Sequence, residues 1–553
     1  MRRPHNAVQP SAMPPAVGLL PLLLLLLLFH LPVSLCSHHH HHSTPPASPS
    51  PSPSPAPSSA PLAVLLACNA TRFQPACVST LSGAAPDAST ADLLAATLSA
   101  LRARLPPAVS TAKSVLASSS NVNLSNAATN CLTFLALSSR RLSPSPSAPP
   151  LLSASTALLH LYDCWSAYKY VNFSRTISDA MAYLDDTITV NSNYISMLAA
   201  RQRYGDETSL WRPPQTERDG YWPPPAASSG ADVDALGVPK GLPANATVCG
   251  AGCDYRTVRE AVAAAPDYGD GAFVVHVKEG AYRETVSVPW EKTNVVLVGD
   301  GMGKTVITGD LNADTSGVST FNTATVGVLA DGFMARDLTI ANTAGPDAHQ
   351  AVAFRSTGDR TVLDGVELLG HQDTLYAHAM RQFYTRCRVA GTVDFVFGNS
   401  AAVLHDTALV VLPRQLRPEK GENDAVTAQG RTDPAQPTGI VLSRCSVNGS
   451  EEYMALYRER PGVHHVYLGR PWKEYSRTVY VGCTLAEIVQ PQGWMPWNGD
   501  FALQTLYYGE YDSAGPGSAA GRRVAWSSQV PKVHVDAYSV ASFIQGHEWI
   551  PRV

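Results

Sequence analysis

The 553-residue chain lacks a strong excess of charge of either sign, and it has no long hydrophobic run beyond its N-terminal region. Its formal charge at pH 7 is −4, from 41 Lys and Arg residues against 45 Asp and Glu residues. A protein that acts mainly on nucleic acid carries a strong basic field, so we expect no nucleic-acid partner, although an anionic polymer could bind in a local groove. No later stretch reaches the roughly eighteen apolar residues of a membrane helix, so the mature form should have no membrane span.

The first 36 residues have the organisation of a secretory signal. Arg2 and Arg3 precede an apolar run from Leu19 to Leu28 that only Pro21 interrupts, and small residues follow. This order predicts a signal peptide over residues 1–36 and a secreted protein; an uncleaved signal anchor is the minority alternative. Five possible glycosylation sites agree with export: Asn69, Asn123, Asn172, Asn245 and Asn448.

Two segments of biased composition divide the remaining chain. Residues 37–62 are rich in Ser, Pro and His, and predict an extended linker in which His38 to His42 are solvated and do not form a functional metal site. Residues 204–246 are rich in Pro, Gly and Ser and predict an interdomain linker. Between them, residues 63–203 have apolar residues at helical spacing, which predicts an all-α bundle. One such stripe contains Leu94, Leu98, Leu101 and Leu105.

Residues 247–553 change to short β-branched segments separated by Gly and Asn. A unit of alternating apolar residues recurs at 338–340, 366–368, 387–389, 407–409, 445–447 and 483–485. Its spacing fits stacked turns of about twenty residues with two longer loops, whereas a β-sandwich should show turns every 8 to 12 residues or so. The pattern favours an all-β right-handed parallel β-helix.

Two acidic segments in this half are the strongest indication of chemistry. Asp373 lies in Gly-His-Gln-Asp-Thr-Leu and Asp394 in Gly-Thr-Val-Asp-Phe-Val-Phe-Gly, each without a neighbouring Lys or Arg. Their separation is about one predicted turn, so both should face one groove from adjacent rungs. A buried carboxylate pair provides one protonated acid and one ionised carboxylate, which acid/base and nucleophilic catalysis require. The alternative is that each Asp is an ordinary turn residue.

The helical half resembles the pectin methylesterase inhibitor family. The resemblance rests on Cys68-Asn-Ala-Thr-Arg-Phe-Gln-Pro-Ala-Cys77 and on Leu161-Tyr-Asp-Cys164. Four cysteines alone allow three pairings. The resemblance implies a four-helix bundle with an N-terminal helical hairpin, and bridges from Cys68 to Cys77 and from Cys131 to Cys164.

The β-helical half resembles the pectin methylesterases over nearly all of residues 247–553. Ordered motifs carry the resemblance: Gly280-Ala-Tyr-Arg-Glu284, Gln350-Ala-Val-Ala-Phe354, the two acidic segments, Leu468-Gly-Arg-Pro-Trp472 and Gly493-Trp-Met-Pro-Trp497. It implies an esterase that removes methyl groups from homogalacturonan in the cell wall, with the helical half, or a separate inhibitor-type domain, as a further partner.

The resemblance also assigns roles to single residues. Asp394 is implied to be the nucleophile and Asp373 the acid/base, with Arg470 favouring the ionised nucleophile. Gln350 and Gln372 are implied to donate to the oxyanion. Substrate contacts are expected from Thr320, Trp472, Tyr376 and Phe397, for each of which core packing is an equal alternative.

No cofactor or metal is implied, since the β-helical half lacks the clustered acidic set of a calcium site. Three departures from the family pattern stand out. His371 replaces a Tyr or Phe, so the groove or its pH response should differ. Thr407 occupies the position of the usual partner of Cys387, so the family bridge should be absent. Cys249 and Cys253 could form a local bridge.

The sequence therefore predicts a secreted pectinesterase. One alternative is an inactive wall protein that binds pectin or an esterase. Another is a pectin lyase or polygalacturonase, which would need a calcium cluster or a different carboxylate set. Whether the bundle blocks the groove, assists folding or inhibits independently is left open by the sequence.

Overall fold

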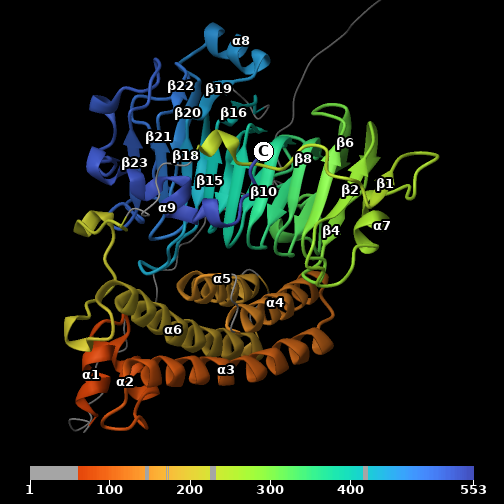
Figure 1. Ribbon diagram of the computed structural model, residues 1–553. Coiled ribbons are helices and arrows are strands. Elements are labelled where there is room, and N and C mark those ends of the chain that lie inside the picture. The colour runs from red at the N-terminus through yellow and green to blue at the C-terminus, as the bar shows by residue number, and fades with distance from the viewer. Residues whose placement is uncertain (1–59, 144–147, 170, 172–173, 225–231, 415–420) are drawn as a thin grey trace, which may run out of the picture. The chain divides into compact units, whose positions relative to one another are not determined.

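The computed structural model describes residues 60–553 except 144–147, 170, 172–173, 225–231 and 415–420. The expected signal peptide and nearly all of the first linker lie outside the described residues. Residues 60–553 form one compact unit that contains both the helices and the β-strands (Figure 1).

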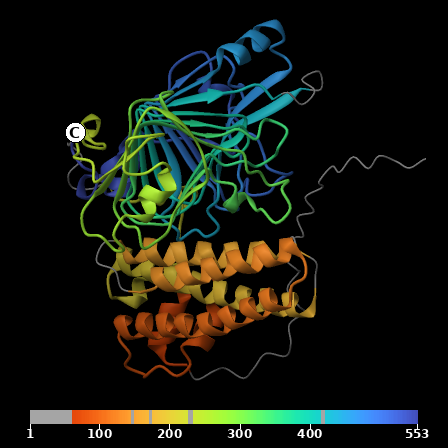
Figure 2. The same cartoon turned by 90° about the vertical axis from the view of Figure 1, so that its right-hand side faces the viewer.

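The N-terminal part consists of a short helical hairpin and four long helices, which lie alongside one another in Figure 2. The hairpin contains α1 (Leu62–Asn69) and α2 (Gln74–Thr80), and the bundle contains α3 (Thr90–Ser118), α4 (Val122–Arg141), α5 (Pro150–Lys169) and α6 (Arg175–Tyr204). Side-chain caps explain where three of these helices begin. Ser89 and Asp92 form a capping box at α3, while Asn121 and Ser174 accept from backbone N–H groups of α4 and α6.

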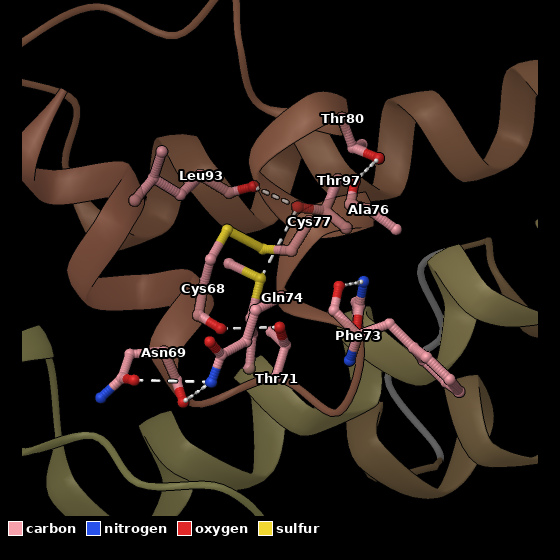
Figure 3. Close-up of a disulfide and its surroundings, with 12 residues drawn as sticks. Cys68, Asn69, Thr71, Phe73, Gln74, Ala76, Cys77, Thr80, Leu93 and Thr97 are labelled. Carbon is pink, nitrogen blue, oxygen red and sulfur yellow. Dashed lines mark hydrogen bonds between the residues drawn. A yellow bond between two sulfur atoms is a disulfide. The ribbon is translucent and has the colours of Figure 1, made fainter. Parts of the chain in front are cut away.

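Two disulfides tie these helices together. Cys68–Cys77 joins α1 to α2, and Figure 3 shows this bridge beside Thr97 of α3, whose hydroxyl donates to the Leu93 carbonyl. Cys131–Cys164 joins α4 to α5. These are the two pairings that the family resemblance implied. The sulfurs lie among the buried apolar side chains of the bundle, which include Leu101.

The C-terminal part is a stack of parallel strands. Its strands are β1 (Ala246–Val248), β2 (Phe273–Val277), β3 (Gly280–Arg283), β4 (Val286–Val288), β5 (Val295–Gly299), β6 (Thr305–Gly309), β7 (Val326–Val328), β8 (Met334–Asn342), β9 (Phe354–Ser356), β10 (Thr361–Leu369), β11 (Leu375–Ala377), β12 (Arg381–Thr385), β13 (Arg388–Gly391), β14 (Val393–Gly398), β15 (Ala401–His405), β16 (Ala408–Val411), β17 (Glu422–Gln429), β18 (Gly439–Ser443), β19 (Ser446–Gly449), β20 (His464–Gly469), β21 (Arg477–Val481), β22 (Thr484–Leu485), β23 (Tyr507–Tyr511) and β24 (Ser528–Gln529). Helices α7 (Val258–Ala263), α8 (Glu451–Glu459) and α9 (Val540–Ile544) accompany them.

The strands form a parallel β-helix, which confirms the fold class expected from the sequence. Seventeen strands belong to one bent sheet, and seven form a second sheet in the order β20-β17-β14-β11-β9-β7-β4. A bend in the large sheet recurs at residues with positive φ, among them Asp337, Arg386, Asp406 and Arg444. Each of these residues directly precedes one copy of the repeated apolar unit. The repeat in the sequence is therefore the short strand that begins after each corner.

The connecting segment after α6 packs on both parts of the compact unit. Trp211 is fully buried with the apolar side chains of the helical bundle. Glu217 lies 3.0 Å from Arg477 of β21, with both side chains buried, and Trp222 stacks on His534 with ring centroids 4.5 Å apart. The segment therefore holds the bundle and the β-helix together by contacts at several points. No helix among the described residues is long and apolar enough to cross a membrane.

Candidate active site

The seven-stranded sheet brings Asp373 and Asp394 together. Asp373 lies just before β11, and Asp394 lies in the next strand of the same sheet, β14. The backbone N–H of Asp373 donates to the carbonyl of Val393, at 3.1 Å. A few positions along these strands, Tyr376 and Phe397 are direct neighbours in register. The 21-residue separation in the sequence therefore corresponds to one turn of the β-helix.

Both aspartates have an unusual backbone conformation. Their φ angles are 68° for Asp373 and 54° for Asp394, in the left-handed region that side chains other than glycine seldom occupy. The register between β14 and β17 also shifts between Val393 and Val396, which places Asp394 in a β-bulge. Bulges and left-handed residues redirect side chains and gather at functional sites, where the surrounding structure maintains them.

Arg470 binds Asp394 through both of its oxygens. Its Nε donates to Oδ1 at 2.8 Å and its Nη2 to Oδ2 at 2.6 Å, the paired geometry of a guanidinium on a carboxylate. Burial would lower the pKa of Arg470, but the neighbouring Asp394 outweighs it and the pKa is raised. Asp394 is only 4% exposed, so the pair is shielded from screening by solvent.

Asp373 is in the opposite electrostatic position. Burial and the nearby charge of Asp394 raise the pKa of Asp373 well above its ordinary value, and Arg470 opposes this only in part. Asp373 therefore holds a proton to a higher pH than an ordinary aspartate. Two carboxyl groups in such different environments can act as an acid and as an ionised nucleophile.

An aromatic cluster lies beside the two carboxyls. The rings of Tyr376 and Phe397 stack with centroids 4.1 Å apart, and the Trp472 ring lies edge-on to Phe397 at 5.8 Å. Tyr376 and Phe397 are buried, whereas Trp472 is partly exposed. Position 430 lies so close to Trp472 that only glycine fits, since a Cβ there would lie 2.7 Å from the indole. Tyr376 and Phe397 thus form a packed base, and Trp472 is the better placed of the three to meet a ligand.

The two glutamines lie on adjacent turns close to Asp373, and both are partly exposed. Gln372 precedes Asp373, and its carbonyl accepts from the N–H of Ala351, the residue after Gln350, at 3.1 Å. Among the described residues, neither side-chain amide has a hydrogen-bond partner. The predicted donors therefore have N–H groups that can bind a ligand. Thr320 is partly exposed at the start of a 3₁₀ turn, Thr320–Asn322, which the bundle contacts.

Trp497 contacts the candidate site, and the sequence assigned it no role. Its ring lies against the guanidinium of Arg470, with 4.3 Å from Cζ to the ring centroid. A cation over an indole is stabilised, and the flat ring also restricts the guanidinium to one orientation. The Gly493-Trp-Met-Pro-Trp497 motif was visible, but no spacing connects it to Arg470.

The structure shows the burial or bonding of each residue that departs from the family pattern. His371 is half-buried; burial lowers its pKa and Asp347 opposes this shift, so its charge change lies below the range of an unperturbed histidine. Cys387 is a buried free thiol whose backbone N–H approaches the Thr407 hydroxyl. Cys249 and Cys253 form a disulfide.

The raised pKa of Asp373 predicts a variant that gains stability while losing function. The folded protein binds this proton up to a higher pH than the unfolded chain does. The contribution to stability is therefore complete at low pH and is lost as the pH rises through the raised pKa. An asparagine side chain is neutral throughout, so Asp373→Asn should unfold at the wild-type temperature near about pH 3 and at a progressively higher temperature toward about pH 7.

Thermal unfolding of both proteins across this pH range, followed by calorimetry, measures that difference. Asp406→Asn is the matched control, because Asp406 also has a positive φ but is exposed on a corner of the large sheet. A difference between wild type and Asp373→Asn that stays constant with pH would contradict a proton held by Asp373.

A buried carboxyl with a raised pKa, an arginine-bound carboxylate and two amide side chains without partners among the described residues lie together on a parallel β-helix, an arrangement that suits a carboxylic ester hydrolase. Comparison with known proteins identifies the family. Residues 245–547 match the Pectinesterase family model. The chain belongs to the pectinesterase family, and it is an enzyme of that kind.

Individual relatives resemble one or both parts of the chain. It is 49% identical over 505 residues to "Probable pectinesterase/pectinesterase inhibitor 64" of Arabidopsis thaliana. The aligned region covers 88% of this chain and 84% of the relative. It is 45% identical to the "Pectinesterase" of Daucus carota over 300 residues, or 54% of this chain and 91% of the relative. The solved "Pectin methylesterase from Carrot" superposes with a TM-score of 0.53 at 42% identity, covering 56% of this chain and 96% of that one.

Proposed function

We propose that this pectinesterase removes methyl esters from homogalacturonan in the cell wall after secretion, with Asp394 as nucleophile and Asp373 as acid/base. The observation that carries the proposal is the pair itself: an arginine-bound carboxylate on a β-bulge, next to a buried carboxyl whose pKa is raised well above its ordinary value. Trp472, over a base of Tyr376 and Phe397, is a surface for stacking of a sugar ring.

The first half-reaction forms an acyl-enzyme. An oxygen of Asp394 attacks the C6 carbonyl carbon, and the carbonyl electron pair moves to the oxygen, where N–H groups of Gln350 and Gln372 can stabilise it. The intermediate then collapses: the bond to the methoxy oxygen breaks, and Asp373 donates its proton to give methanol. A mixed anhydride between Asp394 and the galacturonic acid remains.

The second half-reaction restores both carboxyl groups. Asp373, now ionised, removes a proton from water while the water oxygen attacks the C6 carbonyl. The anhydride bond breaks, Asp394 leaves as a carboxylate held again by Arg470, and the polymer gains a carboxylate after its acid proton is lost to solvent. No glycosidic bond changes, which separates this reaction from that of a lyase or a polygalacturonase.

Methanol release and polymer length together test the proposed reaction. Highly methylated pectin is incubated with the protein, methanol is quantified, and the polymer is sized by gel filtration. We expect methanol to accumulate while the size distribution stays unchanged. Shorter products would indicate attack on the glycosidic bond and would overturn the proposed reaction.

We further propose that the helical bundle inhibits the catalytic domain within the same chain. Support comes from contacts on two segments that border the site. From α4, Asn130 Nδ2 donates to Asn322 Oδ1 at 2.8 Å, and Phe134 packs edge-on against Phe321, in the turn that begins with Thr320.

The second bordering segment follows Trp472. Lys473 Nζ donates to the Tyr162 hydroxyl of α5 at 3.0 Å, and Arg72 lies 3.2 Å from Glu474. Because the bundle contacts residues next to two expected substrate positions, we expect a bound polymer chain to compete with it for space.

Release of the bundle should therefore activate the enzyme. A protease site inserted within residues 225–231, which connect the two parts, allows the chain to be cut after folding. After cutting and chromatographic separation of the bundle, methanol release per catalytic domain should rise by about tenfold or more, within the usual range of coupling between sites. Uncut wild type treated with the same protease is the control, and equal rates before and after separation would contradict inhibition.

A further inference from the structure

A cluster of two buried histidines and one partly exposed aspartate joins the helical bundle to the β-helix. His160 and Asp163 lie one turn apart on α5, and His378 directly follows β11. His378 Nε2 lies 2.9 Å from Asp163 Oδ2, and His160 Nδ1 lies 3.6 Å from the same oxygen. One ligand atom from each of the three residues lies within 4.8 Å of the others.

His160 is the unexplained member of the cluster. Its side chain is completely buried, yet neither ring nitrogen has a hydrogen-bond partner among the described residues. A buried polar nitrogen without a partner is costly, and native structures seldom contain one without a reason. Phe134 stacks parallel to the ring at 6.1 Å and provides no acceptor or donor. The imidazole is thus held in place with a nitrogen 3.6 Å from the Asp163 carboxylate, beyond hydrogen-bond length.

We propose that His160, Asp163 and His378 bind one zinc ion. Two imidazole nitrogens and one carboxylate oxygen are typical zinc ligands, and bonds of about 2.1 Å in a tetrahedral site separate the ligand atoms by about 3.4 Å. The separations of 2.9 and 3.6 Å from the Asp163 oxygen lie on either side of that value, and the ligand atoms of the two histidines lie within 4.8 Å of each other, so the two imidazoles would move toward a shared ion. Water would complete the coordination.

The surroundings of His378 also suit a metal ligand. Its other ring nitrogen, Nδ1, lies 3.0 Å from the hydroxyl oxygen of Thr357. A proton on Nδ1 donated to that oxygen leaves Nε2 free to bind zinc, and ligating histidines are usually oriented by such a second contact. Arg355 donates to the same hydroxyl at 2.8 Å, which fixes the Thr357 side chain.

The consequence is a metal bridge between two parts of one chain. Residues of α5 supply two ligands, and the third, His378, directly follows β11, the strand that Asp373 precedes. Zinc binding would favour the state in which bundle and β-helix are in contact, by an amount that grows with zinc concentration. No metal was predicted from the sequence, because the ligands from the two parts are 215 residues apart along the chain.

Zinc binding to the full chain tests the proposal without reference to enzyme activity. His38 to His42 would bind zinc themselves, so all proteins compared carry serine at these five positions. The variants are His160→Phe, which can stack on Phe134 as the imidazole does, and Asp163→Asn, which can still hydrogen bond to His378. His276→Gln is the control, since His276 pairs with Asp300 at 2.7 Å on the exposed surface.

We expect about one zinc per chain after gel filtration of the parent and of His276→Gln. Affinity measured by chelator competition should fall about 100-fold or more in both cluster variants. Co²⁺ in the parent should show the visible bands of a tetrahedral site, and zinc should raise the unfolding temperature of the parent and of His276→Gln but not of the cluster variants. No stoichiometric zinc in the parent, or equal binding by parent and both variants, would overturn the proposal; if one variant fails to fold, the other decides.

Discussion

Asp394→Asn should abolish nearly all methanol release from methylated pectin, with kcat lower by about 10⁴-fold or more, as expected when a covalent nucleophile is removed. The amide has the shape of the carboxylate but cannot form the anhydride. It also leaves the Arg470 guanidinium without its carboxylate, although the two groups remain close. Substrate binding through Trp472 should persist, so KM should change much less than kcat.

Asp406→Asn is again the matched control for this substitution. It makes the same chemical change at a residue with a similar φ, 47° against 54° for Asp394, but on an exposed corner of the large sheet. Its activity should remain within about twofold of wild type. Methanol release by Asp394→Asn within about tenfold of wild type would exclude Asp394 as the nucleophile.

Arg470→Gln should have the second largest effect, a loss of kcat of about 10³-fold. Removing the cation leaves Asp394 buried beside Asp373 without its partner, and breaking a buried pair in this way costs about 3–5 kcal/mol of stability. Arg470 also holds down the pKa of Asp373, so its loss should raise that pKa further. Asp373 would then remain protonated to higher pH, and the fall in rate on the alkaline side of the pH profile should shift to higher pH.

Activity against pH and the unfolding temperature measure both parts of this prediction. Arg470→Lys separates charge from geometry: it keeps the cation but cannot donate to both oxygens, so its rate should lie between those of wild type and Arg470→Gln. If Arg470→Gln kept the alkaline limb of wild type, Arg470 would have no electrostatic influence on the pair.

The repeat length was enough to predict how the two aspartates meet. Because parallel strands stack one turn apart, 21 residues between Asp373 and Asp394 place them on neighbouring strands, as the pairing of Tyr376 with Phe397 shows. The left-handed backbone and the bulge at Asp394 could not be predicted this way. Both depend on the register between β14 and β17, which are connected by a long segment of chain.

Contacts over long sequence distances were inaccessible for a different reason. Arg470 is 76 residues from Asp394 and was assigned only through the family motif, and the position of Trp497 over it had no signal at all. The His160, Asp163 and His378 cluster depends on how two parts of the chain pack together. Helical stripes such as that of Leu94 and Leu101 predict a bundle but not which surface it contacts.

Trapping of the acyl-enzyme is the most direct test that Asp394 is the nucleophile. Hydroxylamine attacks an anhydride, and attack on its aspartyl carbonyl converts the aspartate into a stable hydroxamate. The enzyme is incubated with methylated pectin and hydroxylamine, digested, and its peptides are sequenced by mass spectrometry. We predict a hydroxamate at Asp394 that requires substrate. A hydroxamate at Asp373 instead, or none at either residue while methanol is released, would contradict this mechanism.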